Sequence, residues 1–307
     1  MKNIYKSLFI LGAISVSLLG CNNSSTPPSP SGPIYNGETP ILSSDGKTLT
    51  YGLYPQKNVN DPTLLTALNS LTKIEPNGWY LYNGVYYAKD YANPWGNHYT
   101  FNNGDLIVAN QAYWFKCEPI SWNVLSVGSG RYFITSTYVL DTHYFFETTN
   151  TRMISGKTIY ANNFQYSDLR NWLNGDFYSR AFSLENRFVL TTNIDNSAST
   201  TNYRTNPYAC DNFEDKIFPL SVKEVHSNYP NDVQKATVTT DYARNRGVLT
   251  HMNRDSIFYQ CGNYWTRSPY NENGNSLTYV YYAGSLELGT ASYTYYGVRP
   301  ALNIRVS

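Results

Sequence analysis

Two phrases near the end of the chain decide the fold: YWTRSP at residues 264–269 and GVRPALNI at residues 297–304. Apolar side chains in both phrases are expected to be buried, and a proline in each phrase fixes φ. We therefore expect a fixed framework made of Trp265, Arg267, Pro269, Gly297, Arg299 and Pro300. Both arginines should anchor this scaffold by hydrogen bonds to carbonyl groups rather than contact a ligand.

The segment between the two phrases consists mostly of Tyr, Asn, Ser, Thr, Gly and small apolar residues. Tyrosine offers rigid contact area at a low entropy cost, and Asn and Ser offer adaptable hydrogen bonds, a mixture typical of antibody binding loops. The alternative is a plain hairpin at a sheet edge, because tyrosine also favours strands. We predict ligand contacts at Asn271, Asn273, Asn275, Thr278, Tyr281, Tyr282, Ser285, Glu287, Thr290, Ser292, Tyr295 and Tyr296.

These residues carry a resemblance to a known family. The closing stretch resembles the C-terminal region of the variable proteins of diversity-generating retroelements, of the spirochaete lipoprotein kind. It is also similar to a broader set of bacterial domains that end in Trp-x-Arg-Ser-Pro and Gly-Val-Arg-Pro-Ala-Leu, and residues 117–125 and 168–175 share that similarity. The resemblance implies a C-type lectin fold of the formylglycine-generating-enzyme branch. It also implies a ligand-binding face near 264–304 whose codons are rewritten at template adenines.

The first 38 residues are typical of an exported, anchored protein. Residues 1–20 combine two lysines with an apolar stretch that is too short to span a bilayer, as in a signal peptide. The sequence LLGC at 18–21 resembles a bacterial lipobox, so we predict lipidation of Cys21 and attachment to an outer or cell-surface membrane through that lipid. An ordinary signal peptide that happens to contain a cysteine is the alternative. Residues 21–38 form a Pro/Ser-rich tether.

The amino-acid composition argues against nucleic acid as a partner and limits the possible fold classes. The 307 residues have a formal net charge of +1 and only 15% charged residues, so no basic field is present to bind nucleic acid. The 30 tyrosines suit a protein with many half-exposed strands. No repeat of 20 to 50 residues occurs, which excludes solenoids and propellers. We predict one α+β domain over residues 39–307, with short helices around antiparallel sheets and no second core.

Several strands and turns are indicated by local signals. A strand is expected from Thr48, and a longer strand region covers residues 113–140. Within that region Gly128-Ser129-Gly130 predicts a turn. Asn77-Gly78 and Asn83-Gly84 predict turns around short Tyr-rich strands, as in a hairpin.

Helix starts are indicated by capping residues. Residues 166–189 are predicted to be helical, with Gly175 in the place of a left-handed C-terminal cap. We predict helix starts at Asp61, Ser167, Ser221 and Thr240. Pro62 follows Asp61 at the first helical position, and Glu224 completes a capping box with Ser221. The helix that starts at Thr240 is expected to end at Gly247.

No strong catalytic or metal motif is present. The four histidines are scattered without a helical His-x-x-x-His pair, and no cysteines have C-x-x-C spacing, so we predict no metal and no cofactor. Besides Cys21, the chain has Cys117, Cys210 and Cys261, which allows one disulfide with one free thiol or three free thiols. Formylglycine-generating enzymes use a pair of reactive cysteines, whereas only Cys261 lies in the corresponding region.

The sequence therefore leaves three functions open. The first is a surface lipoprotein that binds an unknown protein or glycan ligand outside the cell through a retroelement-diversified face, and this protein is not an enzyme. The second is a secreted, lipid-anchored enzyme of the formylglycine-generating or carbohydrate-active sort, which needs catalytic groups that converge in a cleft. The third is an adhesin or lectin-like module of fixed sequence.

Overall fold

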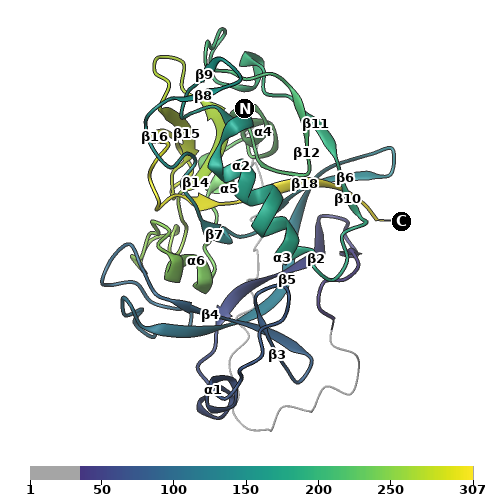
Figure 1. Cartoon of the computed structure of the whole chain (residues 1–307), viewed down its shortest axis with the longest axis vertical. Helices are drawn as coiled ribbons and strands as arrows, with labels where there is room; N and C mark the ends of the chain where they lie inside the picture. Colours follow the sequence, from purple (N-terminus) through teal and green to yellow (C-terminus); the bar gives the residue numbers. More distant parts are fainter. Residues whose placement is uncertain (1–34, 307) are drawn as a thin grey trace, which may run out of the picture. The chain divides into compact units, whose positions relative to one another are not determined.

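A nine-stranded antiparallel sheet forms the centre of the molecule, and the computed structural model describes residues 35–306 (Figure 1). The predicted signal peptide, Cys21 and most of the tether lie outside the described residues. The main path of the sheet runs β1-β2-β5-β6-β18-β10, with β4 paired to β5, β3 to β4, and β13 to β18. Its strands are β1 (Ile41–Leu42), β2 (Thr48–Asn58), β3 (Tyr80–Tyr82), β4 (Val85–Tyr91), β5 (Ala112–Gly128), β6 (Arg131–Ser136), β10 (Val189–Leu190), β13 (Ile217–Pro219) and β18 (Pro300–Arg305).

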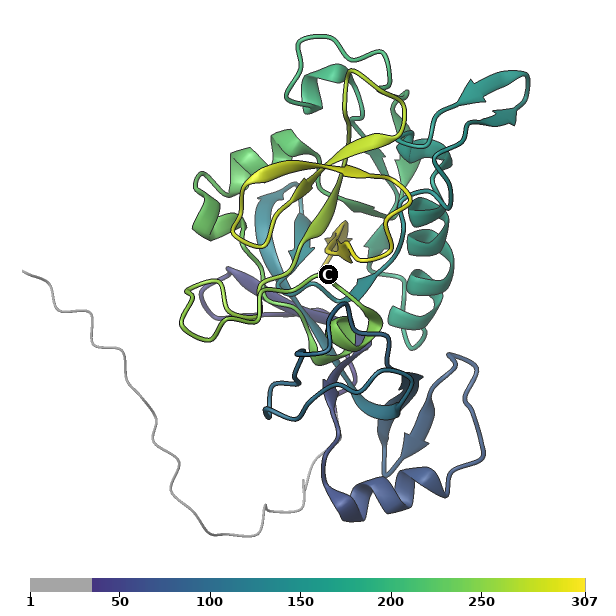
Figure 2. The ribbon, with the colours of Figure 1, turned by 90° about the vertical axis from the view of Figure 1, so that its left-hand side faces the viewer.

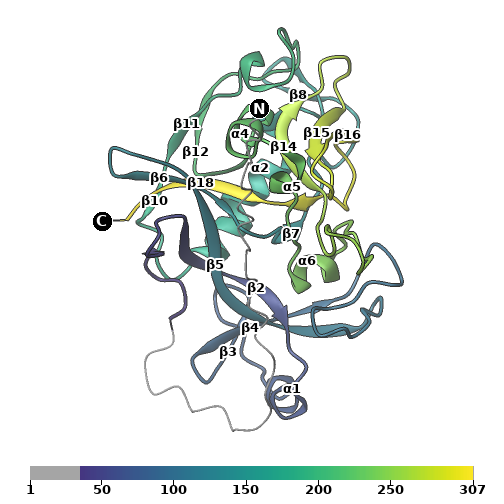
Figure 3. The ribbon, with the colours of Figure 1, turned by 180° about the vertical axis from the view of Figure 1, so that it is seen from behind.

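The predicted strands and turns are present in this sheet. β2 begins at Thr48, and the longest strand, β5, returns into β6 through a turn in which Ser129 and Gly130 have positive φ. β2 and β5 lie side by side along most of their length (Figure 3). Asn83 and Gly84 also have positive φ and close the β3–β4 hairpin, which is the conformation that a two-residue turn needs.

A second sheet holds most of the Tyr-rich C-terminal segment. Its order is β16-β15-β14-β17-β7, and the pair β14–β17 is parallel. The strands are β7 (Asp141–Thr142), β14 (Tyr264–Pro269), β15 (Ser276–Val280), β16 (Leu286–Thr290) and β17 (Gly297–Val298). Two small hairpins complete the strands: β8 (Arg152–Ile154) with β9 (Lys157–Ile159), and β11 (Thr192–Ile194) with β12 (Phe213–Asp215). The α+β class with mostly antiparallel sheets is thus confirmed.

The helices are short and begin at the predicted caps. The side chains of Asp61, Ser167, Ser221 and Thr240 each accept a backbone hydrogen bond in the first turn of their helix, and Ser221 forms the full capping box with Glu224. The helices are α1 (Pro62–Asn69), η1 (Phe164–Tyr166), α2 (Asp168–Trp172), η2 (Leu173–Phe177), α3 (Tyr178–Ala181), η3 (Ala198–Thr200), α4 (Val222–Asn228), α5 (Asp232–Lys235) and α6 (Asp241–Arg246). None of the helices in residues 35–306 is long and apolar enough to cross a membrane.

Two details of the predicted 166–189 helix are wrong. Gly175 does not end the helix with a left-handed cap, because it lies inside η2, a π-helical turn that joins α2 to α3 into one continuous rod (Figure 1). The rod ends at Ala181, before Val189, which instead pairs in β10. The buried side chains of Leu169, Leu173 and Phe177 hold the rod on the core, and this packing outweighs the low helix propensity of glycine.

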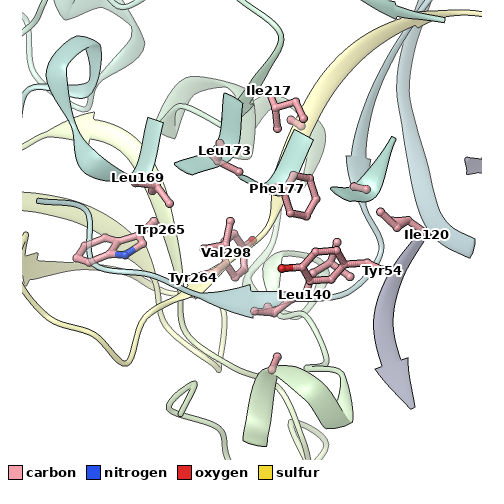
Figure 4. Packing of buried hydrophobic residues seen from close by; sticks show 14 of the residues in the cluster. Tyr54, Ile120, Leu140, Leu169, Leu173, Phe177, Ile217, Tyr264, Trp265 and Val298 are labelled. Carbon is pink, nitrogen blue, oxygen red and sulfur yellow. The ribbon is translucent and has the colours of Figure 1, made fainter. Parts of the chain in front are cut away.

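One large apolar cluster fills the space between the two sheets and the α2–α3 rod. Figure 4 shows Tyr54 from β2, Phe177 from η2, Val298 from β17 and Leu140 from the loop before β7 within this cluster. A small second cluster, built on Leu68, Tyr87 and Trp114 with neighbours from α1 and β3, is a satellite of this core. The described residues nevertheless all belong to one compact unit.

The three cysteines in the described residues are free, and Cys117 and Cys261 are buried. Of the two possibilities that the sequence leaves open, the structure therefore shows three free thiols. Buried thiols pack as small apolar groups, which fits the places of these two residues in the core.

Candidate ligand-binding site

The two framework arginines, Arg267 in β14 and Arg299 directly after β17, tie the C-terminal sheet to the rest of the protein. Arg267 donates to the carbonyl oxygens of Pro219 at 2.8 Å and Asp195 at 3.1 Å, and it binds both carboxylate oxygens of Glu224. Arg299 donates to the carbonyl of Ser136 at 2.9 Å and to two tyrosine hydroxyls. Both are almost fully buried, so the predicted anchoring role is confirmed.

The predicted contact residues do not form one patch, because eight of them divide between the two ends of the β15–β16 hairpin, while Ser292, Tyr295 and Tyr296 lie in the loop after β16 and Thr278 lies within β15. Asn271, Asn273 and Asn275 lie in the β14–β15 turn, next to Thr290 at the end of β16. Tyr281, Tyr282 and Ser285 lie in the β15–β16 turn at the opposite end, together with Glu287 at the start of β16. Since β15 has five residues, the two turns are roughly 15 Å apart. Figure 2 shows this hairpin in yellow on the side that faces the viewer.

The first of these turns is fixed from below by a buried amide. Nδ2 of Asn162 donates to the carbonyl oxygens of Asn273 at 2.9 Å and Ser276 at 3.1 Å, with a longer contact to that of Tyr270. Asn162 has no exposed surface. The backbone of the turn is therefore held by the core while its own side chains remain half-buried at the surface.

Two of the twelve predicted contact residues are buried, which corrects their assignment. Thr278 is 4% exposed and Tyr296 is 4% exposed. The ring of Tyr296 stacks on Tyr279 at 4.2 Å between centroids and meets the edge of Trp265 at 4.5 Å. Thr278 lies in β15, in which the successive side chains from Leu277 to Val280 are all buried, so both faces of the strand are covered there. These two side chains pack within the scaffold and cannot present a contact surface in this structure.

A large open pocket lies beside the last loop of the C-terminal segment, and we call it the ring pocket. Its volume is about 540 Å³. Four aromatic side chains, from Tyr91, Trp95, Tyr144 and Tyr295, line it. The centroids of the Trp95 and Tyr295 rings are 4.1 Å apart, and Tyr293 stacks behind Tyr295 at 4.9 Å. Partly exposed aromatic rings that are in contact with one another offer a preformed apolar surface.

Two titratable side chains that line the ring pocket, Tyr295 and His143, have shifted pKa values, and Arg246 is a charged group in the same lining. Burial raises the pKa of Tyr295 to about 12, and the nearby Tyr293 contributes, so the hydroxyl stays protonated at neutral pH. Burial lowers the pKa of His143 from its ordinary value, and Nδ1 of this ring lies 2.6 Å from the carbonyl oxygen of Tyr144. The hydroxyl of Thr142 lies 2.5 Å and 2.8 Å from two backbone carbonyls of the 294–296 loop and so fixes that loop to β7.

Sequence reasoning predicted only Tyr295 among the aromatic residues that line this pocket. It missed Trp95, His143 and Arg246, which reach the same pocket from three distant parts of the chain. Trp95 had a usable signal, because it is a large apolar side chain in a loop of polar residues, proline and glycine, and it is 51% exposed. For the other two no local signal exists, since only the folded chain brings them to the pocket.

Comparison with known families adds one finding. Residues 129–306 match the family model described as "Domain of unknown function (DUF6273)". The chain belongs to the DUF6273 family. Neither the search of curated proteins nor the search of solved structures found a match. The DUF6273 segment supplies Thr142, His143, Arg246 and Tyr295 to the ring pocket, whereas Trp95 comes from residues that precede it.

Among residues 35–306 no group of three or more His, Cys, Asp or Glu side chains is placed to hold a metal ion. What the arrangement does offer is surface for binding: aromatic rings in contact at the ring pocket, polar turns on a fixed backbone, and a buried framework.

Proposed function

We propose that this DUF6273 protein binds a protein or glycan ligand outside the cell through its C-terminal face, while a lipid on Cys21 anchors it to an outer or cell-surface membrane. The observation that carries the proposal is the ring pocket, in whose lining the rings of Trp95 and Tyr295 lie in contact with centroids 4.1 Å apart. Preformed pockets lined by aromatic side chains and a few polar groups are the usual form of a ligand site.

We also propose that the domain has a C-type lectin-like fold and that retroelement-directed rewriting diversifies the face. Ten of the twelve predicted contact residues keep some exposed side-chain surface, while both framework arginines are buried. Surface substitutions usually change stability by no more than about 0.5 kcal/mol, so such positions tolerate exchange. The DNA around the gene tests this part. A nearby reverse transcriptase gene and a near-copy repeat with adenines at these codons are expected, and their absence leaves a module of fixed sequence.

Binding itself is tested with arrays of immobilised glycans and extracellular proteins. We expect the protein to bind one class of immobilised glycan or protein on the arrays. The variants Trp95→Ala and Tyr295→Ala should lose that binding. Tyr138→Ala is the matched control, because Tyr138 is 39% exposed and does not line the ring pocket. Equal binding by all three variants would remove the ring pocket from the proposal.

The burial and protonation of the Cys261 thiol support a binding function over catalysis of the formylglycine-generating type. Cys261 is 6% exposed, and burial raises the pKa of its thiol to about 11. The thiolate is the nucleophilic form, so a thiol that stays protonated at neutral pH is a poor nucleophile. Slow labelling of Cys261 by iodoacetamide in the folded protein is expected, whereas rapid labelling at pH 7 would favour the enzyme alternative.

The lipid anchor has a test that does not depend on the ligand. Cells that express the full chain and are fed a radiolabelled fatty acid should label the protein, and Cys21→Ser should abolish both the label and the membrane attachment. One acyl chain binds membranes only marginally, so stable attachment indicates more than one chain. An unlabelled protein that remains membrane-bound would contradict lipidation at this residue.

A further inference from the structure

The ring pocket contains a hydrogen-bond acceptor that the fold leaves open. Nδ1 of His143 lies 2.6 Å from the carbonyl oxygen of Tyr144. Because a carbonyl oxygen only accepts, the proton of the neutral imidazole is on Nδ1 and the lone pair is on Nε2. Within residues 35–306 Nε2 has no hydrogen-bond partner, and it is not among the buried polar atoms that lack one. His143 lines the ring pocket, so a ligand there can reach this acceptor.

The ring of His143 is held in a fixed orientation and stays neutral. It stacks on Trp172 of α2 at 5.1 Å between centroids and lies 4.4 Å from the ring of Tyr144. Burial is the largest influence on its pKa and lowers it, although the carboxylates of Asp141 and Asp168 act in the opposite direction. At pH 7 the ring is therefore uncharged, and its Nε2 accepts hydrogen bonds but does not donate them.

The lining of the ring pocket has no charge that lacks a partner. Arg246 is the only charged residue in it among the described residues, and no aspartate or glutamate of the described chain lines it. The guanidinium already lies against two carboxylates, with Nε 3.3 Å from Asp141 and a terminal nitrogen 3.5 Å from Asp90. This lining therefore suits a neutral ligand.

The rest of the lining combines exposed aromatic faces with neutral polar groups. Tyr91 is 68% exposed and Trp95 is 51% exposed, so both rings keep much of their apolar surface open. The side chains of Asn93 and Thr294 also line the pocket and have no hydrogen-bond partner in the part of the chain that the structure describes. A sugar ring matches both kinds of surface, because its C–H groups pack on aromatic rings and its hydroxyls donate and accept hydrogen bonds.

An apolar peptide side chain matches this lining less well than a sugar does. It would cover the aromatic faces but leave Nε2 of His143 and the side chains of Asn93 and Thr294 without partners. Polar groups that lose water without gaining a partner weaken binding. The pocket volume of about 540 Å³ lies within the range of about 300–1,000 Å³ that is usual for sites of small ligands. A sugar unit is thus the ligand that satisfies the whole lining.

We propose that the ring pocket binds one unit of a neutral glycan, whose ring packs on Trp95 and Tyr295 while one of its hydroxyls donates to Nε2 of His143. This inference rests on the proposed ligand-binding function and narrows the ligand to a sugar. His143 then determines specificity, because it selects a hydrogen-bond donor at one position of the sugar.

Protonation of His143 makes sugar binding depend on pH. It puts a hydrogen on Nε2, so the sugar hydroxyl has to turn, and it places a second positive charge near Arg246, which a bound neutral sugar would shield from water. Binding should therefore weaken as pH falls below about 6.5. The titratable and charged groups that face His143 are Asp141 of β7, the adjacent Tyr144, Asp168 of α2 and Arg246 of α6. No other histidine of the described chain lines the pocket.

Titrations of the full-length protein at pH 7.5, followed by tryptophan fluorescence, test the ligand class. The neutral sugar probes are lactose, maltotriose and N,N′-diacetylchitobiose. The comparison probes are N-acetylneuraminic acid, which carries a carboxylate, and N-acetyl-phenylalanine amide, which stands for a peptide side chain. We expect at least one neutral sugar to bind, and the comparison probes to bind at least about tenfold more weakly. Absence of binding by all three neutral sugars, or tighter binding of either comparison probe, would overturn the proposal.

These outcomes separate the glycan inference from the binding function on which it rests. A protein on the arrays whose binding is lost in Trp95→Ala, together with no binding of the neutral sugars, would keep the ring pocket as a binding site and remove the sugar. Loss of sugar binding in Trp95→Ala supports both.

Variants of His143 test its part in binding. His143→Phe keeps a ring and removes Nε2, so it should weaken sugar binding about tenfold and abolish the pH dependence. His143→Gln supplies an acceptor that does not titrate, so it should bind the sugar with a flat pH profile. His226→Gln is the matched control, because His226 is an exposed histidine outside the pocket.

Near-UV circular dichroism at each pH checks that the natural protein and its variants are folded. Equal sugar affinity of the natural protein at pH 5.5 and pH 7.5 would overturn the role of His143 without any variant. So would a His143→Phe protein that keeps both the affinity and the pH profile of the natural protein.

Discussion

The clearest test of the scaffold compares two neighbouring tyrosines, Tyr296 and Tyr293. Tyr296 is 4% exposed and packs against Tyr279, Trp265 and Tyr295 with ring centroids 4.2 to 4.9 Å away. Tyr293 is 40% exposed. If the closing segment is a rigid platform with an exchangeable surface, the two positions must respond very differently to truncation.

Truncating a buried aromatic side chain to alanine costs about 3–5 kcal/mol, so we expect Tyr296→Ala to lower the free energy of unfolding by about that much. At Tyr293 the same change should cost no more than about 0.5 kcal/mol. For a domain of this size the first variant should melt roughly 6–12 °C lower than the natural protein. Urea-induced unfolding followed by near-UV circular dichroism measures both free energies.

A third variant, Tyr296→Phe, separates packing from hydrogen bonding, because it keeps the ring and removes only the hydroxyl. The hydroxyl of Tyr296 is hydrogen-bonded to that of Tyr279, so we expect this variant to cost about 1 kcal/mol, the usual net value of one hydrogen bond. If Tyr296→Ala were as stable as Tyr293→Ala, the stacked rings would not be part of the core, and the reassignment of Tyr296 from contact residue to scaffold would be wrong.

Three further changes probe other parts of the scaffold. Glu224→Ala removes the carboxylate that pairs with the buried guanidinium of Arg267. Because loss of one partner of a buried ion pair is strongly destabilising, we expect it to lower the free energy of unfolding in urea by about 3 kcal/mol. Glu224→Gln should lower it by less. Gly284→Ala should destabilise more than Gly156→Ala, because both have positive φ but only a Cβ at 284 would meet the carbonyl oxygen of Asp232, at 1.8 Å. Burial lowers the pKa of His143, so the unfolded chain binds this proton at a higher pH than the folded protein does. The free energy of unfolding should therefore fall as pH falls through about 6.5, and His143→Gln should flatten that slope between pH 5 and pH 8 in thermal melts.

Much of the local structure was predictable because its causes are local. The caps at Ser167 and Ser221 depend on one side chain and the backbone three residues later. The Asn83-Gly84 turn depends on φ values that these two residue types tolerate. Such signals can be recognised within a few residues, and the structure confirms each of them.

The failures concern features that depend on contacts between distant residues. Gly175 looked like a helix end, but core packing on both sides of it continues the helix through a π turn. Alternation along β15 would expose every second side chain, yet Thr278 is covered because other elements pack over both faces. The meeting of Trp95 with Tyr295 joins residues 200 positions apart, so no sequence window could contain it.

The division of the contact residues limits how one ligand can use this surface. The β14–β15 turn and the β15–β16 turn lie at opposite ends of a strand of five residues, roughly 15 Å apart, so a small ligand cannot reach both. A small ligand that fills the ring pocket therefore contacts Tyr295 and its neighbours and does not contact the β14–β15 turn, which holds Asn273. Only a protein surface or an extended glycan can contact both turns at once. Affinity that depends on Tyr295 together with Asn273 would indicate such a large ligand, whereas dependence on Tyr295 alone would indicate one that is confined to the pocket.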